Sequence, residues 1–416
     1  MSGATLISHG CRLNIAESEK IAAMLGGADD LVVVNSCAVT AEAVKTARQA
    51  IRRARRDRPG ARIVVTGCAA ETEPETFRAM AEVSAIVPNT KKFELSLYPS
   101  SQRKPGSISR GLGLASGGDA AQLSLERRAE SHARTFLPVQ NGCDHRCTFC
   151  IIPYGRGPSR SLPAGGVIEE IKAAVDQGAK EIVLTGVDLT AYGADLPGQP
   201  SLGSLVARIL KLVPELPRLR LSSLDPCEMD ETLLDLIAHE ARLMPHIHLS
   251  LQAGDDMILK RMKRRHSRAQ AVRLVANLKA LRPEIAIGAD LIAGFPTEDE
   301  SMFANTLALI DDCVIALAHI FPYSPRTGTP AARMPQVARS IVKDRAARLR
   351  AAAARAKAAW LKEQVGQVTD VLVELDGTSG HAANFARVRF AATQPNSIQR
   401  ITIAGIDGDS LVGVAA

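Results

Sequence analysis

The chain has 416 residues, a net charge of +7 and a pI of about 9.0, with 23% charged and 46% apolar residues. This length accommodates two or three domains, and the composition is that of a globular protein without membrane association, because no apolar run approaches the roughly 18 residues that span a bilayer. The first residues, MSGATLISHGC, lack the basic and apolar segments of a signal peptide, so we expect a cytoplasmic location. In that reducing compartment, eight cysteines favour metal binding or catalysis over disulfides.

Residues 1–100 alternate apolar strands with amphipathic segments. The strands ATLISHGC, LVVVNSC and IVVTGC each end on a cysteine, and helices are expected at 16–25, 41–56 and 74–81. This alternation predicts an α/β fold with a Rossmann-like parallel sheet. Because parallel strands point the same way, Cys11, Cys37 and Cys68 would lie along one carboxyl edge, where open α/β sheets bind ligands.

Residues 101–134 are rich in Gly and Ser and are expected to form a linker. Six apolar stretches follow, with amphipathic segments between them: FLPVQNGC, EIVLTGVD, RLRLSSLD, HIHLSLQ, IGADLIAGFP and VIALAHIFPYS. Six successive strand–helix units predict a partial (βα)6 barrel within residues 135–365, with its chemistry at the carboxyl ends of the strands.

The last part of the chain changes character twice. Residues 336–365 are rich in Ala and Arg and contain no Pro or Gly, which predicts one long helix that ends before Gly366. In residues 366–416 the segments DVLVELDG, FARVRFAA, RITIAGIDG and SLVGV read as short strands between glycines. They predict a small β-barrel.

Six of the eight cysteines form two triplets. One consists of the strand-end cysteines Cys11, Cys37 and Cys68, and the other of Cys143, Cys147 and Cys150, which lie within eight residues after the first barrel strand. An iron–sulfur cube held by three cysteines leaves its fourth iron free for a ligand that is not protein. The missing cysteine would then mark the active position.

Two other interpretations of the triplets remain open. A structural zinc ion needs four ligands, which His145 could complete in the second triplet and His9, less favourably placed, in the first. The cysteines of the first triplet could also be buried small apolar residues, although a cysteine at each of three successive strand ends disfavours that coincidence.

The pattern Cys143-x3-Cys147-x2-Cys150 after the first strand of a βα barrel resembles the radical S-adenosylmethionine (SAM) enzymes. The segments SHGCRLNIAESE, VVNSCAVTAEA, VVTGCAA, CTFCIIPYGRGPSRS, LSLQAGDDMILKRMKRRH and IAGFPTE resemble the radical methylthiotransferases over nearly the full length. This resemblance implies two [4Fe-4S] clusters, of which the loop triplet binds SAM and the strand-end triplet holds the auxiliary cluster, and a C-terminal barrel of TRAM type. One departure is Thr297, where the family usually has glycine.

The segment NSCAVTAEAVKTARQAIRRARR, with MKRRH and GVDLTAYG, resembles the branch that acts on threonylcarbamoyladenosine beside the tRNA anticodon. The resemblance implies a transferase that inserts a methylthio group at C2 of N6-threonylcarbamoyladenosine at tRNA position 37. One SAM would supply the methyl group and another a 5′-deoxyadenosyl radical. The alternatives are isopentenyladenosine or a ribosomal protein aspartate as the acceptor, and, from another class, a non-catalytic zinc-stabilised RNA-binding protein.

The resemblance also implies SAM contacts at the carboxyl ends of the barrel strands. Arg264 would hold the SAM carboxylate, and Phe149 would present its backbone to the adenine. The remaining candidates are Gly186, Asp188, Ser223, Ser250, Gln252, Asp290 and Gly294. Each of them could instead satisfy loop amides.

Two basic runs, 45–58 and 260–268, predict contact with tRNA phosphates. In a helix, the first would place Lys45, Arg48, Arg52 and Arg55 on roughly one face. Residues 366–416 hold three Arg against five acidic residues, so charge does not identify the small barrel as RNA-binding. Besides tRNA, the expected partners are an electron donor such as flavodoxin or ferredoxin and a sulfur source. With no obvious pairing segment, we expect a monomer.

Overall fold

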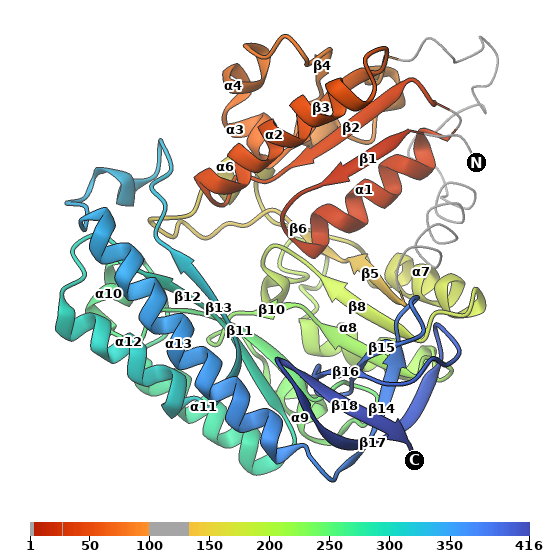
Figure 1. Ribbon diagram of the computed structural model, residues 1–416, viewed down its shortest axis with the longest axis vertical. Coiled ribbons are helices and arrows are strands. Elements are labelled where there is room, and N and C mark those ends of the chain that lie inside the picture. The colour runs from red at the N-terminus through yellow and green to blue at the C-terminus, as the bar shows by residue number, and fades with distance from the viewer. Residues whose placement is uncertain (1–3, 27, 100–132) are drawn as a thin grey trace.

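The computed structural model describes residues 4–26, 28–99 and 133–416. The expected linker, 101–134, lies outside the described residues except for its last two positions. The N-terminal sheet and the C-terminal small barrel lie at opposite ends of the long axis, with the central barrel between them (Figure 1).

The N-terminal domain is a four-stranded parallel sheet in the order β1-β2-β3-β4. Its strands are β1 (Thr5–Ser8), β2 (Leu31–Ser36), β3 (Arg62–Gly67) and β4 (Ala85–Ile86). Its helices are α1 (Arg12–Met24), α2 (Ala41–Asp57), α3 (Cys68–Thr72) and α4 (Pro74–Arg78), with 3-10 turns η1 (Asn89–Lys91) and η2 (Leu95–Leu97). The apolar runs of β2 and β3 are buried, as expected of strands covered on both faces. The parallel sheet confirms the prediction, while α1 starts earlier and α4 ends earlier than expected.

The central barrel contains all six predicted strands. They are β5 (Arg134–Pro138), β8 (Glu181–Thr185), β9 (Arg218–Leu221) continued by β10 (Ser223–Leu224), β11 (His246–Gln252), β12 (Ala286–Ala293) and β13 (Ile315–Pro322). An interruption at Ser222 divides them into two parallel sheets, β5-β8-β9 and β10-β11-β12-β13. The helices are α6 (Ile152–Arg156), α7 (Ala164–Asp176), α8 (Leu202–Leu212), α9 (Glu231–His239), α10 (Asp256–Arg261), α11 (Arg268–Leu281) and α12 (Glu300–Asp312), with the 3-10 turn η3 (Leu189–Ala191).

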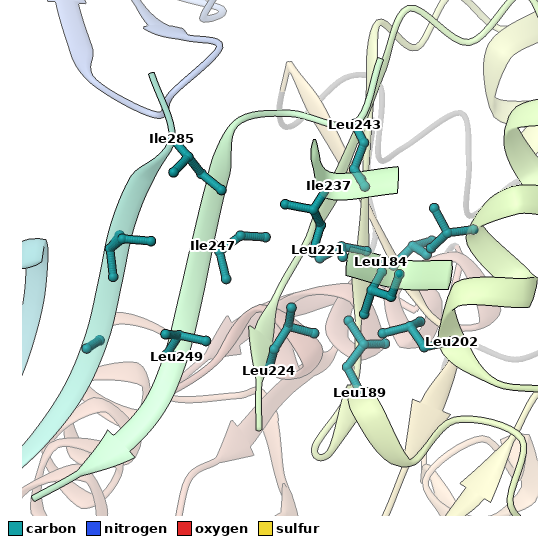
Figure 2. Close-up of a cluster of buried hydrophobic side chains, with 14 of the residues drawn as sticks. Leu184, Leu189, Leu202, Leu221, Leu224, Ile237, Leu243, Ile247, Leu249 and Ile285 are labelled. Atoms are coloured by element: carbon teal, nitrogen blue, oxygen red, sulfur yellow. The ribbon is translucent and has the colours of Figure 1, made fainter. Parts of the chain in front are cut away.

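Strand alternation sorts the barrel side chains into two faces. Leu184, Leu221, Ile247 and Leu249 belong to the buried apolar cluster between strands and helices (Figure 2). Burial of each such side chain contributes about 1.5–3 kcal/mol. The alternate positions of β11 face the lumen, and these are all polar: His246, His248, Ser250 and Gln252. Strand β11 therefore has an apolar face toward the helices and a polar face toward the lumen.

The small C-terminal barrel is closed, in the order β14-β15-β16-β18-β17. Its strands are β14 (Val368–Val373), β15 (Ser379–Ala382), β16 (Arg387–Arg389), β17 (Ile398–Asp407) and β18 (Ser410–Ala415), and it follows the 3-10 turn η4 (Pro330–Arg333) and the long helix α13 (Arg339–Glu363). The sequence predicted the helix but only four of the five strands. The missed strand, β15, has the sequence SGHA, which lacks an apolar alternation; backbone pairing with β14 and β16 holds it.

Neighbouring domains close the partial barrel at its side and floor. Ile15 and Ala16 of α1 pack on Phe136 and Val183, which face the lumen. At the amino ends of the strands, the Phe385 ring of the small barrel lies among the guanidinium groups of Arg12, Arg134 and Arg220, at 5.3, 5.3 and 4.8 Å from the ring centroid. Arg220 also makes a buried bidentate pair with Glu181, at 2.8 and 3.1 Å. These contacts leave the carboxyl ends of the strands as the accessible end.

Candidate functional site

The loop that carries Cys143, Cys147 and Cys150 is fixed by protein contacts on both sides. It follows β6 (Gln140–Asn141), which pairs with β7 (Arg160–Ser161) across the base of the loop. Gly142 has φ +75°, and a Cβ there would lie 1.9 Å from the carbonyl oxygen of Pro158, so only glycine fits. The buried Thr148 donates its amide to the carbonyl of Met262 at 3.1 Å.

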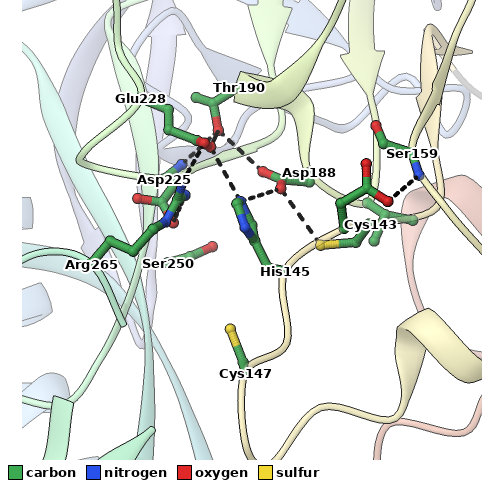
Figure 3. A network of polar contacts seen from close by, with 12 residues as sticks. Cys143, His145, Cys147, Ser159, Asp188, Thr190, Asp225, Glu228, Ser250 and Arg265 are labelled. Atoms are coloured by element: carbon green, nitrogen blue, oxygen red, sulfur yellow. Dashed lines mark hydrogen bonds and ion pairs between the residues drawn. The ribbon is translucent and has the colours of Figure 1, made fainter. Parts of the chain in front are cut away.

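Carboxylates surround the histidine of this loop (Figure 3). His145 Nε2 lies 2.8 Å from Asp188 and 3.5 Å from Glu228. Hydrogen bonding to Asp188 and then to Glu228 raises the pKa of His145 to about 10. At neutral pH His145 is therefore a cation held by two acids, whereas a zinc ligand must be a neutral imidazole. Asp188 also lies 3.5 Å from Cys143 Sγ, which places this predicted residue directly beside the loop triplet.

Arg264 connects the loop triplet to the ends of the barrel strands. Its side chain is 8% exposed, and Nη2 donates to Asp225 and to the carbonyl of Ser250, each at 2.8 Å. Its Nη1 lies 3.7 Å from Cys147 Sγ. A buried guanidinium in this position suits a carboxylate ligand beside the triplet, and its contact with SAM stays a prediction.

The other predicted SAM residues divide into two groups. Gly186 packs against Gln140, and Gln252 ends β11 with φ +70°, a left-handed conformation that is strained for a residue with a side chain. Gly186 follows β8, Ser223 begins β10 and Gln252 ends β11, so all three lie at the open end of the barrel. Asp290 lies within β12 and not at its end, and its Oδ1 accepts from His248 at 2.9 Å and from His319 at 3.2 Å.

Gly294 and Phe149 have clear packing roles. A Cβ at Gly294 would lie 2.6 Å from Val342 of α13, so this glycine allows the trailing helix to approach. The Phe149 ring packs edge-on against Phe295, with centroids 6.5 Å apart. Thr297 has φ +67°, in the left-handed region that favours glycine.

The strand-end triplet gathers at the carboxyl edge of the N-terminal sheet. Cys11 caps α1, Cys37 follows β2, and Cys68 begins α3. A Cβ at Gly10 would lie 2.8 Å from Cys37 Sγ, so glycine permits this approach. Burial, with smaller contributions from Cys68 and Cys11, raises the pKa of Cys37 to about 11.

The spacing of the sulfurs tests which metal centre the triplets fit. Tetrahedral zinc, with Zn–S bonds of about 2.3 Å, would hold its sulfurs about 3.8 Å apart. Within the described part of the chain, neither triplet brings its three sulfurs within 4.8 Å of one another. All eight cysteines are free thiols. Each triplet offers three free thiols, one fewer than a structural zinc site requires, whereas a four-iron cube held by three cysteines keeps one iron open.

The two triplets face each other across α6. A Cβ at Gly155 would lie 3.3 Å from the Cα of Cys68, so the loop of the barrel packs directly on the N-terminal site. Burial, with smaller contributions from Cys147 and Cys68, raises the pKa of Cys150 to about 12. The contribution from Cys68 crosses the domain boundary.

A buried ionic network that the sequence did not predict lies between the triplets. Arg156 pairs with Glu17 at 2.8 Å, and Lys92 Nζ lies 2.6 Å from the same carboxylate. Glu17 belongs to the segment SHGCRLNIAESE and Arg156 to PYGRGPSRS, but no local pattern pairs residues that are 139 positions apart.

Comparisons with known proteins agree with this geometry. Residues 137–310 match the radical SAM superfamily, and residues 4–88 match the family described as Uncharacterized protein family UPF0004. The barrel and its three-cysteine loop thus define a radical SAM enzyme, a class that uses SAM and a [4Fe-4S] cluster.

Relatives narrow this class to one family. A threonylcarbamoyladenosine tRNA methylthiotransferase from Rickettsia prowazekii is 47% identical, over 92% of this chain and 90% of the relative. A tRNA-2-methylthio-N(6)-dimethylallyladenosine synthase from Erythrobacter litoralis is 36% identical, over 89% and 86%. A threonylcarbamoyladenosine tRNA methylthiotransferase from Thermotoga maritima is 31% identical, over 98% and 96%. The chain belongs to the radical SAM tRNA methylthiotransferases, as the motifs predicted, and is an enzyme that transfers a methylthio group.

Within the described ranges, no helix combines the length and the apolar character needed to cross a bilayer.

Proposed function

We propose that this enzyme adds a methylthio group to C2 of N6-threonylcarbamoyladenosine at position 37 of tRNA. The observation that carries the proposal is the pair of facing three-cysteine sites, of which the loop triplet lies within the region that matches the radical SAM superfamily. One site suits radical generation and the other suits a sulfur source. The choice of nucleoside rests on the 47% identity to a threonylcarbamoyladenosine enzyme, against 36% for the dimethylallyladenosine enzyme.

In this proposal Cys143, Cys147 and Cys150 hold the cluster that binds SAM. When bound, cluster and cofactor supply a carbon-centred radical by reductive cleavage of SAM. The chain positions and shields that chemistry: Arg264 binds the SAM carboxylate, and Asp188 with His145 orders the loop. Helix α1 and the small barrel close the side and the floor, which limits the approach of solvent from these two directions.

The strand-end triplet would hold the second [4Fe-4S] cluster and the sulfur to be transferred. Each turnover consumes one sulfur atom, and the reductive cleavage of SAM requires an electron, so the enzyme needs a sulfur source and a donor such as flavodoxin or ferredoxin. The free cysteines suit a reducing cytosol, where we place the enzyme as a monomer.

For tRNA we propose Lys45, Arg48 and Arg52 of α2 as phosphate contacts. Lys45 and Arg52 have side chains that are 61% and 50% exposed. Arg55, which we predicted on the same face, donates to the carbonyls of Pro59, Ala61 and Glu82 at 2.7–2.8 Å. Because these three bonds tie the end of α2 to its own domain, we leave Arg55 out of the proposed interface.

Two triple variants test whether the two cysteine triplets have separate roles. Replacing Cys143, Cys147 and Cys150 with Ala should halve the iron of the anaerobically reconstituted enzyme, from about eight to about four, and abolish formation of 5′-deoxyadenosine. Replacing Cys11, Cys37 and Cys68 should also halve the iron but leave SAM cleavage largely intact while methylthiolation is lost. Production of 5′-deoxyadenosine by the first variant would contradict the assignment.

A further inference from the structure

Three charged side chains are buried together between the two cysteine triplets. Glu17, Lys92 and Arg156 are 4%, 2% and 3% exposed. The carboxylate of Glu17 accepts two hydrogen bonds from Arg156, at 2.8 and 3.0 Å, and lies 2.6 Å from Lys92 Nζ. Glu17 and Lys92 belong to the N-terminal domain and Arg156 to the barrel.

The charges of this network do not balance. Two cations share one anion, so the three buried side chains carry a net charge of +1. The other hydrogen-bond partners, the side-chain oxygens of Asn14, Asn89 and Asn141, are neutral. An uncompensated buried charge is costly, so a second anion is expected in contact with the network.

The cysteines of the strand-end triplet lie where this anion is expected. Arg156 interacts electrostatically with Cys68 and Cys11, and Lys92 with Cys68. Asn89 accepts from Lys92 at 2.8 Å, and its amide nitrogen lies 4.0 Å from Cys68 Sγ. The nearby Glu71 is only partly buried, and it accepts the backbone amide of Asn89 at 2.8 Å.

We infer that Lys92 and Arg156 are the buried counter-charges of the cluster held by Cys11, Cys37 and Cys68. A [4Fe-4S] cluster in its 2+ state with three thiolates carries a charge of −1, which matches the +1 of the network. This inference rests on the proposed second cluster. Because Arg156 comes from the barrel, the charge balance of the auxiliary site is complete only when the two domains are docked.

The inference fixes the direction in which each charge moves the reduction potential of the auxiliary cluster. Reduction adds one negative charge to the cluster, so a nearby cation stabilises the reduced state more than the oxidised state. Loss of Lys92 should therefore make the midpoint potential more negative. Loss of the negative charge of Glu17 should make it more positive.

We would measure this potential by spectroscopic redox titration of the full-length protein in which Cys143, Cys147 and Cys150 are Ala, so that one cluster gives the signal. Lys92→Met and Glu17→Gln should shift the midpoint in opposite directions. The control is Lys91→Met, an exposed neighbour that should leave the potential unchanged. If the network only docked the domains, Lys92→Met and Glu17→Gln would both weaken the site in the same way, and shifts of equal sign, or none, would overturn the inference.

Cluster retention gives a second readout. If Lys92→Met does not hold its iron, the counter-charge role predicts native circular dichroism and recovery of the iron in Lys92→Arg. Failure of Lys92→Arg to restore iron in a folded protein would overturn the inference. Failure of the proposed second cluster would be distinguishable, because replacement of Cys11, Cys37 and Cys68 in the full enzyme would then leave the iron content unchanged.

Discussion

Phe385 offers a quantitative test of how the small barrel closes the floor of the central barrel. Its ring separates three guanidinium groups, from Arg12, Arg134 and Arg220, and lies 4.9 Å from the His246 ring. We consider Phe385→Leu, which keeps an apolar side chain but removes the aromatic face. The substitution should weaken the packing of the small barrel against the central barrel without altering the fold of the small barrel.

The magnitude follows from the contacts. A cation–π contact contributes about 0.5–1 kcal/mol when exposed and about 2 kcal/mol when desolvated. Three contacts to one ring are not additive, so we expect a loss of about 2–3 kcal/mol. The guanidinium groups also repel one another: burial, followed by Arg134 and Arg220, lowers the pKa of Arg12 to about 10. Removing the ring therefore leaves three cations less well separated.

Hydrogen exchange with mass spectrometry reports this local stability directly. A loss of about 2–3 kcal/mol should speed exchange at the amino ends of β5 and β9 and in β15 by roughly 30- to 150-fold under conditions where opening is in equilibrium. Phe390→Leu is the matched control, because Phe390 is partly buried against the core of the small barrel and makes no such cation contact within the described residues. Equal effects of the two substitutions on β5 and β9 would refute the reasoning.

Three further predictions concern stability and RNA binding. Burial alone would raise the pKa of Glu181, but Arg220 lowers this pKa to about 2. The pair therefore stabilises the fold above pH about 4.5, and this contribution is lost as the pH falls towards 2. Glu181→Gln should cost about 3 kcal/mol at pH 7 and flatten the acid limb of a denaturation series; an unchanged limb would contradict this. Thr297→Gly should raise stability by about 1 kcal/mol, seen as a higher melting temperature, because glycine removes the cost of φ +67°. Replacing Lys45, Arg48 and Arg52 with Gln should weaken tRNA binding and reduce the slope of log K against log salt by about 2–3 units. The same replacement of the exposed residues Lys172, Arg208 and Lys211 should leave the affinity and the slope unchanged. Parallel salt plots for the two variants would contradict the proposed interface.

The elements that the sequence predicted well are those with a local signal. Apolar runs such as LVVVNS identified β1, β2 and β3 of the N-terminal sheet and the six strands of the central barrel, and the position of each cysteine after its strand defined the two triplets. The two-residue strand β4 was not predicted, because it is too short to show an apolar run. Strand β15 was not predicted, because its four residues show no alternation of apolar and polar side chains and are held by pairing with neighbouring strands.

The sequence predicted side-chain roles less well where the partners lie far away in the chain. Arg55 matched the helical spacing of the basic face, but the carbonyls that bind it come from the next loop and from Glu82. Asp290 was placed at a strand end, whereas His248 and His319 hold it within the lumen. The network of Glu17, Lys92 and Arg156 joins three separate segments, so only the fold reveals it.

The central claim is tested most directly by mass spectrometry of tRNA nucleosides from cells that lack this gene. The account predicts loss of 2-methylthio-N6-threonylcarbamoyladenosine and accumulation of N6-threonylcarbamoyladenosine. The wild-type gene should restore the product, and the variant with Ala at Cys143, Cys147 and Cys150 should not. An unchanged level of that product, or loss of the methylthiolated isopentenyladenosine instead, would contradict the account.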